Sequence, residues 1–212
     1  MRLLCINSTP MSDEAISRRL TKAFVQGWRC KNRDGIVIAR DLASIDIPAI
    51  NAEWICANYT PEGSRTKQQD ELLRLSKELI AELHDADEYV IGMPMHNWGP
   101  PSKFKLWVDQ IVVPGCRGVL SQKSCTFVIA TGWHHRPNSA RASENYLVPW
   151  LRTLFGYLGV EDVRFIMADG SMEIAKGGID REAFLAPHIE AIHGLFMEGR
   201  DDYLAARYME GV

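Results

Sequence analysis

Residues 89–105 read Tyr89-Val90-Ile91-Gly92-Met93-Pro94-Met95-His96-Asn97-Trp98-Gly99-Pro100-Pro101-Ser102-Lys103-Phe104-Lys105. The first five residues form a short apolar run typical of a buried strand, and Pro94 ends it. Two further prolines stiffen the chain that follows. From about residue 102 to 113 the pattern is that of a helix, which Pro114 ends. The stretch therefore predicts a buried strand, a rigid loop and a helix in succession.

The same alternation of apolar runs and helical patterns extends to both sides of this stretch. We expect strands over residues 3–6, 36–38, 89–93, 125–130 and 163–167. We expect helices over about residues 16–28, 72–83, 102–113, 140–158 and 181–197, and irregular chain over about 41–63. Strand–helix alternation repeated in this way predicts an α/β fold, with a parallel sheet covered by helices on both faces. We expect one domain, residues 1–198, followed by a charged tail, residues 199–212.

Composition narrows the class of protein. The chain has 212 residues, of which 46% are hydrophobic and 24% charged, as in a soluble protein with one core. A formal net charge of -3 without a Lys/Arg run argues against nucleic acid as a partner. The apolar runs are too short for a membrane span or a signal peptide, so we expect a cytoplasmic location. The five cysteines form no CxxC pair, which argues against a zinc site or a disulfide framework.

Ligands of parallel sheets bind beyond the carboxyl ends of the strands. The loop after the first expected strand, residues 7–17, contains neither GxGxxG nor GxxxxGK[ST] but is rich in hydroxyl side chains. Hydroxyls and the free N–H groups of a helix start can hold a phosphate without a lysine. The alternative is simple capping of the helix by Ser12 or Asp13.

The loop after the third expected strand has a more specific composition. Asn97 offers both a donor and an acceptor, and Met95 and Trp98 offer apolar contact. A flavin requires an apolar wall together with fixed polar groups at its pyrimidine edge. The alternative is a rigid connector with a packed tryptophan.

The loop after the fourth expected strand reads Thr131-Gly132-Trp133-His134-His135-Arg136. Adjacent side chains of an extended chain point to opposite sides, and no third ligand is evident, so we expect no metal site here. We interpret the loop as a ligand loop or a solvated turn.

Five other residues receive structural interpretations. Trp28 and Trp107 fit the apolar faces of expected helices and should lie in the core. Asp85, Asp87 and Glu88 precede a strand and should be solvated.

The run Pro94-Met95-His96-Asn97-Trp98, followed by Pro101, Lys105 and Asp109, resembles the PMYNF…P…LK…D signature of the FMN-dependent NADH-azoreductases. These enzymes belong to the flavodoxin-like NAD(P)H:quinone reductases. Residues 40–43 and 149–159 resemble further segments of the family, and the likeness covers about residues 2–195.

The resemblance implies a flavodoxin-like three-layer α/β/α fold with a five-stranded parallel sheet in the order 2-1-3-4-5. It also implies bound FMN, NADH or NADPH as reductant, and a homodimer with the site at the interface. By position, the residues expected to bind the phosphate are Thr9, Ala15, Ile16 and Ser17. Those expected to line the isoalloxazine ring are Met95, His96, Asn97 and Trp98 on one side, and Thr131, Gly132, Trp133 and His134 on the other. Tyr157 stands where the family has an aromatic residue near the substrate.

The chain departs from the family pattern at four places. His96 replaces the usual tyrosine, and Ala15 and Ile16 replace polar residues of the phosphate turn. The 131–136 loop is bulkier than usual, and residues 114–120 form a shorter segment than the one that carries an aromatic residue over the flavin in relatives.

The family implies a ping-pong FMN reductase, in which NAD(P)H gives a hydride to flavin N5 and the reduced flavin passes it to a quinone, azo or similar conjugated acceptor. We consider His96 as a proton donor to the acceptor, because histidine exchanges protons near neutral pH. The alternative is a ring that only packs or forms a hydrogen bond. Alternative functions are a specialised tailoring reductase on the same scaffold and a flavin-binding electron carrier.

Overall fold

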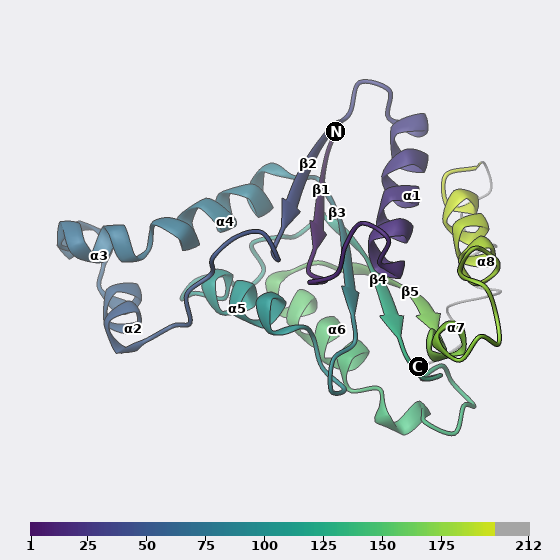
Figure 1. The fold of residues 1–212 in the computed structure, drawn as a ribbon. Coiled ribbons are helices and arrows are strands. Elements are labelled where there is room, and N and C mark those ends of the chain that lie inside the picture. The colour runs from purple at the N-terminus through teal and green to yellow at the C-terminus, as the bar shows by residue number, and fades with distance from the viewer. Residues whose placement is uncertain (198–212) are drawn as a thin grey trace.

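Five parallel strands form one sheet in the computed structural model, which describes residues 1–197 (Figure 1). The expected tail, residues 199–212, lies outside the described residues. The strand order is β2-β1-β3-β4-β5, which confirms the predicted order. The strands are β1 (Arg2–Asn7), β2 (Ile36–Asp41), β3 (Glu88–Pro94), β4 (Ser124–Thr131) and β5 (Asp162–Asp169).

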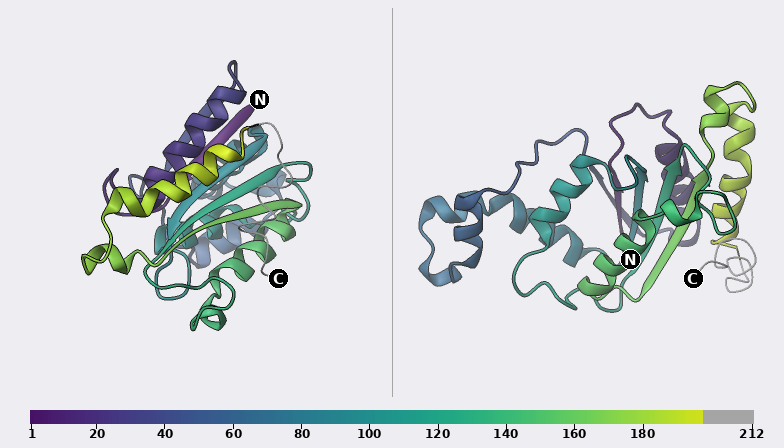
Figure 2. Two further views of the ribbon diagram at one scale, coloured as in Figure 1. Left: turned by 90° about the vertical axis from the view of Figure 1, so that its right-hand side faces the viewer. Right: turned by 90° about the horizontal axis from the view of Figure 1, so that it is seen from below.

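Helices cover both faces of the sheet, as Figure 2 shows, and confirm the three-layer arrangement. One face packs against α1 (Ile16–Lys31) and α8 (Arg181–Gly194). The other packs against α4 (Arg74–Asp85), α5 (Ser102–Ile111) and α6 (Leu147–Leu158). The shorter helices are α2 (Ala52–Tyr59), η1 (Glu62–Ser64), α3 (Lys67–Leu72), η2 (Ala142–Glu144) and α7 (Met172–Ala175). Within residues 1–197, every helix is too short or too polar to cross a membrane.

The two cores follow from the two-residue period of the strands. Leu3 and Cys5 of β1 belong to the core under α1 and α8, whereas Leu4 and Ile6 belong to the core on the opposite face. The middle of a central strand buried on both faces is therefore largely apolar. Gly92 of β3 permits the close approach of α1, because a Cβ atom there would lie 2.5 Å from Cγ2 of Thr21.

Residues 41–63 were expected to be irregular, but α2 lies within this segment and η1 begins in it. The side chain of Asn51 caps α2 by accepting a hydrogen bond from the Trp54 amide at 2.8 Å. The pair α2 and α3 projects sideways from the sheet (Figure 1). It holds a small apolar cluster of its own, formed by Trp54, Ala57 and Leu73. The last helix ends at Gly194, three residues earlier than the predicted end at 197.

Trp28 and Trp107 are buried, as predicted, and Asp85 and Asp87 are exposed. The prediction for Glu88 is wrong, because this side chain is 3% exposed. Its Oε2 accepts a hydrogen bond of 2.8 Å from the indole N–H of Trp28. The N–H group of a buried indole needs a hydrogen-bond acceptor. Glu88, the first residue of β3, supplies it, although it stands 60 positions from Trp28 in the sequence.

Candidate functional site

Three loops meet at the carboxyl edge of the sheet. They follow β1, β3 and β4, which are neighbours in the sheet, with Asn7 opposite Gly92 and Pro94 opposite Ala130. The strand order changes direction between β1 and β3, which is where open α/β sheets bind ligands. All predicted cofactor residues lie on these loops or at the start of α1.

The loop after β1 is anchored by its hydroxyl groups. Ser8 and Thr9 are buried. The Ser8 amide and hydroxyl donate to the Gly92 carbonyl at 3.0 and 3.4 Å, and the Thr9 hydroxyl oxygen accepts from the Met11 amide at 3.3 Å. The hydroxyls thus shape the loop, and Thr9 keeps its proton for a further acceptor.

The start of α1 carries no cap. Ala15 occupies the cap position without a side-chain hydrogen bond, so the alternative of capping by Ser12 or Asp13 is wrong. The amide groups of Ile16, Ser17 and Arg18 have no hydrogen-bond acceptor within residues 1–197. Three free N–H groups at the positive end of a 16-residue helix suit an anion.

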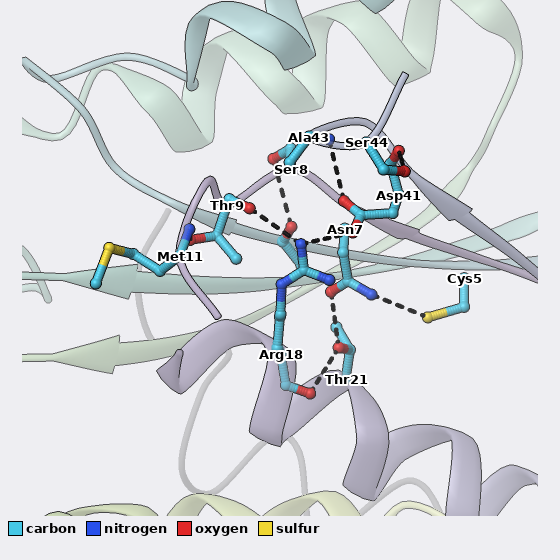
Figure 3. Close-up of polar contacts among 11 residues, drawn as sticks. Cys5, Asn7, Ser8, Thr9, Met11, Arg18, Thr21, Asp41, Ala43 and Ser44 are labelled. Carbon is cyan, nitrogen blue, oxygen red and sulfur yellow. Dashed lines mark hydrogen bonds and ion pairs between the residues drawn. The ribbon is translucent and has the colours of Figure 1, made fainter. Parts of the chain in front are cut away.

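Arg18 adds a cation at this position, and the sequence reasoning missed it. Its Nη2 donates to the Thr9 carbonyl at 3.1 Å and to Oδ2 of Asp41 at 2.8 Å (Figure 3). Its Nε is buried and has no acceptor in the described part of the chain. An unpaired buried donor beside an uncapped helix start fits a phosphate group of a cofactor. No pattern in the sequence marked this residue, because Arg18 and Asp41 stand 23 positions apart and only the fold brings them together.

The loop after β3 contains a strained tight turn. The amide of His96 donates to the Gly99 carbonyl at 3.0 Å, and the amide of Gly99 donates back at 2.9 Å. Asn97 and Trp98 between them have φ angles of 48° and 64°, a left-handed conformation that is costly for residues with a Cβ atom. Such strain is found at functional sites more often than elsewhere.

The side chains of this turn after β3 are exposed to solvent. His96 and Asn97 are exposed, and the Trp98 ring is 53% exposed, so it is not packed in the core. The Trp98 indole N–H donates to Oε2 of Glu144 at 3.1 Å. That hydrogen bond, together with Arg141, lowers the pKa of the Glu144 carboxyl.

The loop after β4 rests on Asp169, at the end of β5. Its Oδ2 accepts from the amides of His135 and Arg136, both at 2.8 Å. The Thr131 hydroxyl lies 2.7 Å from Oδ1 of Asp169 and 2.6 Å from the Trp133 carbonyl, and its single proton serves one of them at a time. The 131–136 loop therefore has a defined shape.

The two histidines of this loop point apart, as the strand geometry predicted. His135 is buried, with Nδ1 lying 3.1 Å from the Arg141 carbonyl oxygen. His134 is exposed on one side and packs on Gly170, where a Cβ atom would lie 2.3 Å from its ring. Among residues 1–197, no three His, Cys, Asp or Glu side chains are grouped to hold a metal ion.

Tyr157 lies apart from these loops. It occupies the last turn of α6, which runs back from the carboxyl edge toward the start of β5, a length of about 18 Å for this helix. The Tyr157 carbonyl accepts from the Gly118 amide at 3.0 Å, so the segment of residues 114–120 also lies at this distant end. Within one protomer, the structure does not bring Tyr157 to the predicted cofactor residues.

Comparisons with known proteins agree with this architecture. The sequence model of the Flavodoxin_2 family, described as a flavodoxin-like fold, matches residues 1–192. A protein of Burkholderia lata named FMN-dependent NADH:quinone oxidoreductase 3 is 52% identical over 92% of the chain and 99% of its own length. A protein of Acidobacterium capsulatum named FMN-dependent NADH:quinone oxidoreductase is 38% identical, over 91% of the chain and 97% of its own length.

Solved structures show the same fold at lower identity. The azoreductase AzrA superposes with a TM-score of 0.82 and 16% identity, over 92% of this chain and 99% of that one. An FMN-dependent NADH-azoreductase of Bacillus anthracis, solved in complex with FMN, superposes with a TM-score of 0.79 and 19% identity, over 92% and 97% of the two chains.

Proposed function

The chain belongs to the Flavodoxin_2 family, and from this premise we propose that it is an FMN-dependent NADH:quinone oxidoreductase. The relatives of that name match it over nearly their whole length. One observation carries the proposal: an uncapped helix start with an unpaired arginine lies at the same sheet edge as an exposed turn of amide and aromatic side chains. These are the two chemistries that FMN presents, a phosphate and a flat ring with polar edges.

The residues present fit FMN at both ends. The amides of Ile16 and Ser17, the Thr9 hydroxyl and Arg18 would hold the phosphate. Ala15 would add no donor, because its amide already donates to the Ser12 carbonyl at 2.9 Å. The 95–98 turn would meet one side of the isoalloxazine ring, and residues 131–134 would close the other. A free backbone donor would let Ile16 stand where relatives have a polar residue, since an amide is independent of its side chain.

The cofactor and the side chains of the protein would supply different parts of the reaction. FMN, when bound, would supply hydride transfer through flavin N5 between NADH and a quinone or azo acceptor, in a ping-pong cycle. Met95 and Trp98 would exclude water from the ring, and Asn97 would orient its pyrimidine edge. His96, exposed on the same turn, would hold a proton on its imidazole for the reduced acceptor.

A homodimer forms part of the proposal. Tyr157 is 46% exposed and lies at the end of α6 remote from the loops of its own protomer. To contact an acceptor it must therefore reach the site of another protomer, and we propose that Tyr157 of the partner subunit does so. Sedimentation equilibrium tests the dimer. A monomer at micromolar concentration that keeps full activity would contradict it.

The bulky loop after β4 favours a second candidate, a tailoring reductase with a narrow acceptor range. Its exposed Trp133 and ordered backbone suit selection of one acceptor. Good FMN binding with poor turnover of all simple quinones would favour this candidate. Rapid bleaching of bound flavin by NADH would exclude the electron-carrier alternative. The choice between NADH and NADPH and the cytoplasmic location stay predictions.

The deciding experiment is an anaerobic titration of FMN-loaded protein with NADH and with NADPH, followed by quinone and azo acceptors. We expect bleaching of the flavin band by NADH, recovery on adding a quinone, and parallel lines in initial-rate plots. Protein that retains no flavin absorption after incubation with FMN and desalting would refute the proposal. Full turnover of a His96→Phe variant at every pH would exclude the proton role alone.

A further inference from the structure

Trp98 and Glu144 connect two segments at the carboxyl edge of the sheet. The Trp98 indole N–H donates to Oε2 of Glu144 at 3.1 Å, although the two residues stand 46 positions apart in the sequence. Trp98 belongs to the turn after β3, and Glu144 is the last residue of η2, the short helix that follows the loop after β4. The Trp98 ring is 53% exposed, so packing in the core does not fix it. Its orientation therefore depends on this hydrogen bond.

Contacts with Arg141 place Glu144 itself. The same Oε2 atom lies 3.0 Å from Nη1 of Arg141, and the Glu144 amide donates to the Arg141 carbonyl at 3.0 Å. That carbonyl oxygen also lies 3.1 Å from Nδ1 of the buried His135 ring. The His135 amide in turn donates to Asp169 at the end of β5. A continuous series of hydrogen bonds thus connects the end of β5 to the Trp98 ring.

Arg141 also contacts the aromatic residue of the loop after β4. Its Cζ atom lies 4.7 Å from the centre of the Trp133 ring, and Nζ of Lys176 lies 5.2 Å from the same centre. A cation over the face of an indole is attracted by the ring. Glu144 and Arg141 therefore link two exposed tryptophans, which the proposed function assigns to opposite sides of the flavin ring.

The turn after β3 is strained and needs a contact from outside. Trp98 has a φ angle of 64°, and such a conformation persists only where the surrounding structure fixes it. Glu144 supplies an ionised acceptor, since the hydrogen bond from Trp98 and the positive charge of Arg141 lower the pKa of its carboxyl. An ionised acceptor forms a stronger hydrogen bond than a neutral one.

We propose that Glu144 is a positioning residue, which holds the Trp98 ring in the orientation that meets the isoalloxazine ring. The inference rests on the proposed function, in which Trp98 contacts one side of that ring. Glu144 acts through Trp98 and touches neither the cofactor nor the acceptor. Its removal should therefore weaken binding of the flavin ring and leave the phosphate contacts at the start of α1 unchanged.

The first measurement is the indole N–H signal of Trp98 in a ¹H–¹⁵N correlation spectrum of FMN-free and of FMN-loaded protein. The chain has six tryptophans, and the signal of Trp98 is the one that Trp98→Phe removes. In Glu144→Ala this signal should shift and exchange with water about fivefold faster, because one hydrogen bond is lost. Glu144→Gln should retain the signal, since the amide oxygen can accept the same hydrogen bond. The matched control is Glu71→Ala, because Glu71 pairs with Arg74 at 2.9 Å but lies on α3, which projects away from the sheet (Figure 1).

The second measurement is equilibrium dialysis with FMN and with riboflavin, which carry the same ring. We expect Glu144→Ala to weaken the binding of both about fivefold, and Glu144→Gln to change either by less than about twofold. Glu71→Ala should leave both unchanged. In a Trp98→Phe background, the further substitution Glu144→Ala should have no effect on either flavin, because the hydrogen bond is already absent.

An unchanged Trp98 signal in Glu144→Ala would overturn the positioning role. A changed signal with unaffected riboflavin binding would also overturn it, and would leave the proposed function standing. So would an equal loss of flavin binding in the Trp98→Phe background, since Glu144 would then act through another contact. Wild-type protein that binds neither flavin would refute the proposed function, while the indole signal would still show whether Glu144 holds Trp98.

Discussion

Asp169 holds the loop after β4 in place by hydrogen bonds, and we expect its replacement to lower the stability of the protein. Its carboxylate accepts two amide hydrogen bonds of 2.8 Å and lies 2.7 Å from the Thr131 hydroxyl. Asp169→Ala removes all of these acceptors. A hydrogen bond to a charged group contributes about 1.5–3 kcal/mol, and water can reach part of the exposed loop once it opens. We therefore expect a loss of about 3 kcal/mol in the free energy of unfolding.

Asp169→Asn should cost far less, because the hydrogen bonds can be rearranged. The amide oxygen can accept from His135 and Arg136 as Oδ2 does now. The amide nitrogen then donates to the Thr131 oxygen, and the Thr131 proton turns to the Trp133 carbonyl, which is already 2.6 Å away. All contacts are kept and only the charge is lost, so we expect about 1 kcal/mol.

Urea unfolding of the FMN-free protein measures both values without the stabilisation that bound ligand adds. Asp162→Ala is the control, because Asp162 lies at the other end of β5 and, among residues 1–197, its side chain forms only a solvent-accessible ion pair with Arg164. It should change stability by about 0.5 kcal/mol or less. Equal losses for Asp169→Ala and Asp169→Asn, or no loss for either, would refute the proposed hydrogen-bond rearrangement.

Three further predictions concern other parts of the molecule. Arg18→Gln should weaken FMN binding about tenfold in equilibrium dialysis and leave riboflavin binding unchanged, because only FMN carries the phosphate; equal weakening of both would contradict this role. Lys123→Met should lower the free energy of unfolding by about 2 kcal/mol, since its ammonium group donates to three carbonyls at the end of α4; an unchanged urea midpoint would argue against it. Burial lowers the pKa of His188, so the unfolded chain binds its proton more readily than the folded one. This contribution to stability is complete above the ordinary pKa of 6.5 and is lost as the pH falls below it, so His188→Gln should flatten the acid side of a plot of urea midpoint against pH.

The fold could be predicted because its signals are local. Apolar runs mark the central strands, and residues such as Leu20 and Phe24 mark the buried side of α1 by their spacing. Helix α2 was missed because eight residues give a weak periodicity, although Asn51 stands three residues before Trp54 as a capping residue does.

The site could be predicted less completely, because its decisive contacts join distant positions. Arg18 meets Asp41 across 23 positions, and Trp98 meets Glu144 across 46. Neither pairing has a sequence pattern of its own. Each depends on which loops the strand order places side by side, and that order was known only from the resemblance.

The two ends of the proposed site consist of different groups, and this difference determines how substitutions can change the specificity for the acceptor. The phosphate end consists mainly of backbone amides at the start of α1, which remain when a side chain such as that of Ile16 replaces a polar one. The acceptor end consists of side chains on two ordered loops, held by Glu144 and Asp169. Substitutions at Trp133 should therefore alter the contacts to the ring and the acceptor while the contacts to the phosphate persist. On this reasoning the bulky loop after β4 adapts a common flavin scaffold to one class of acceptor.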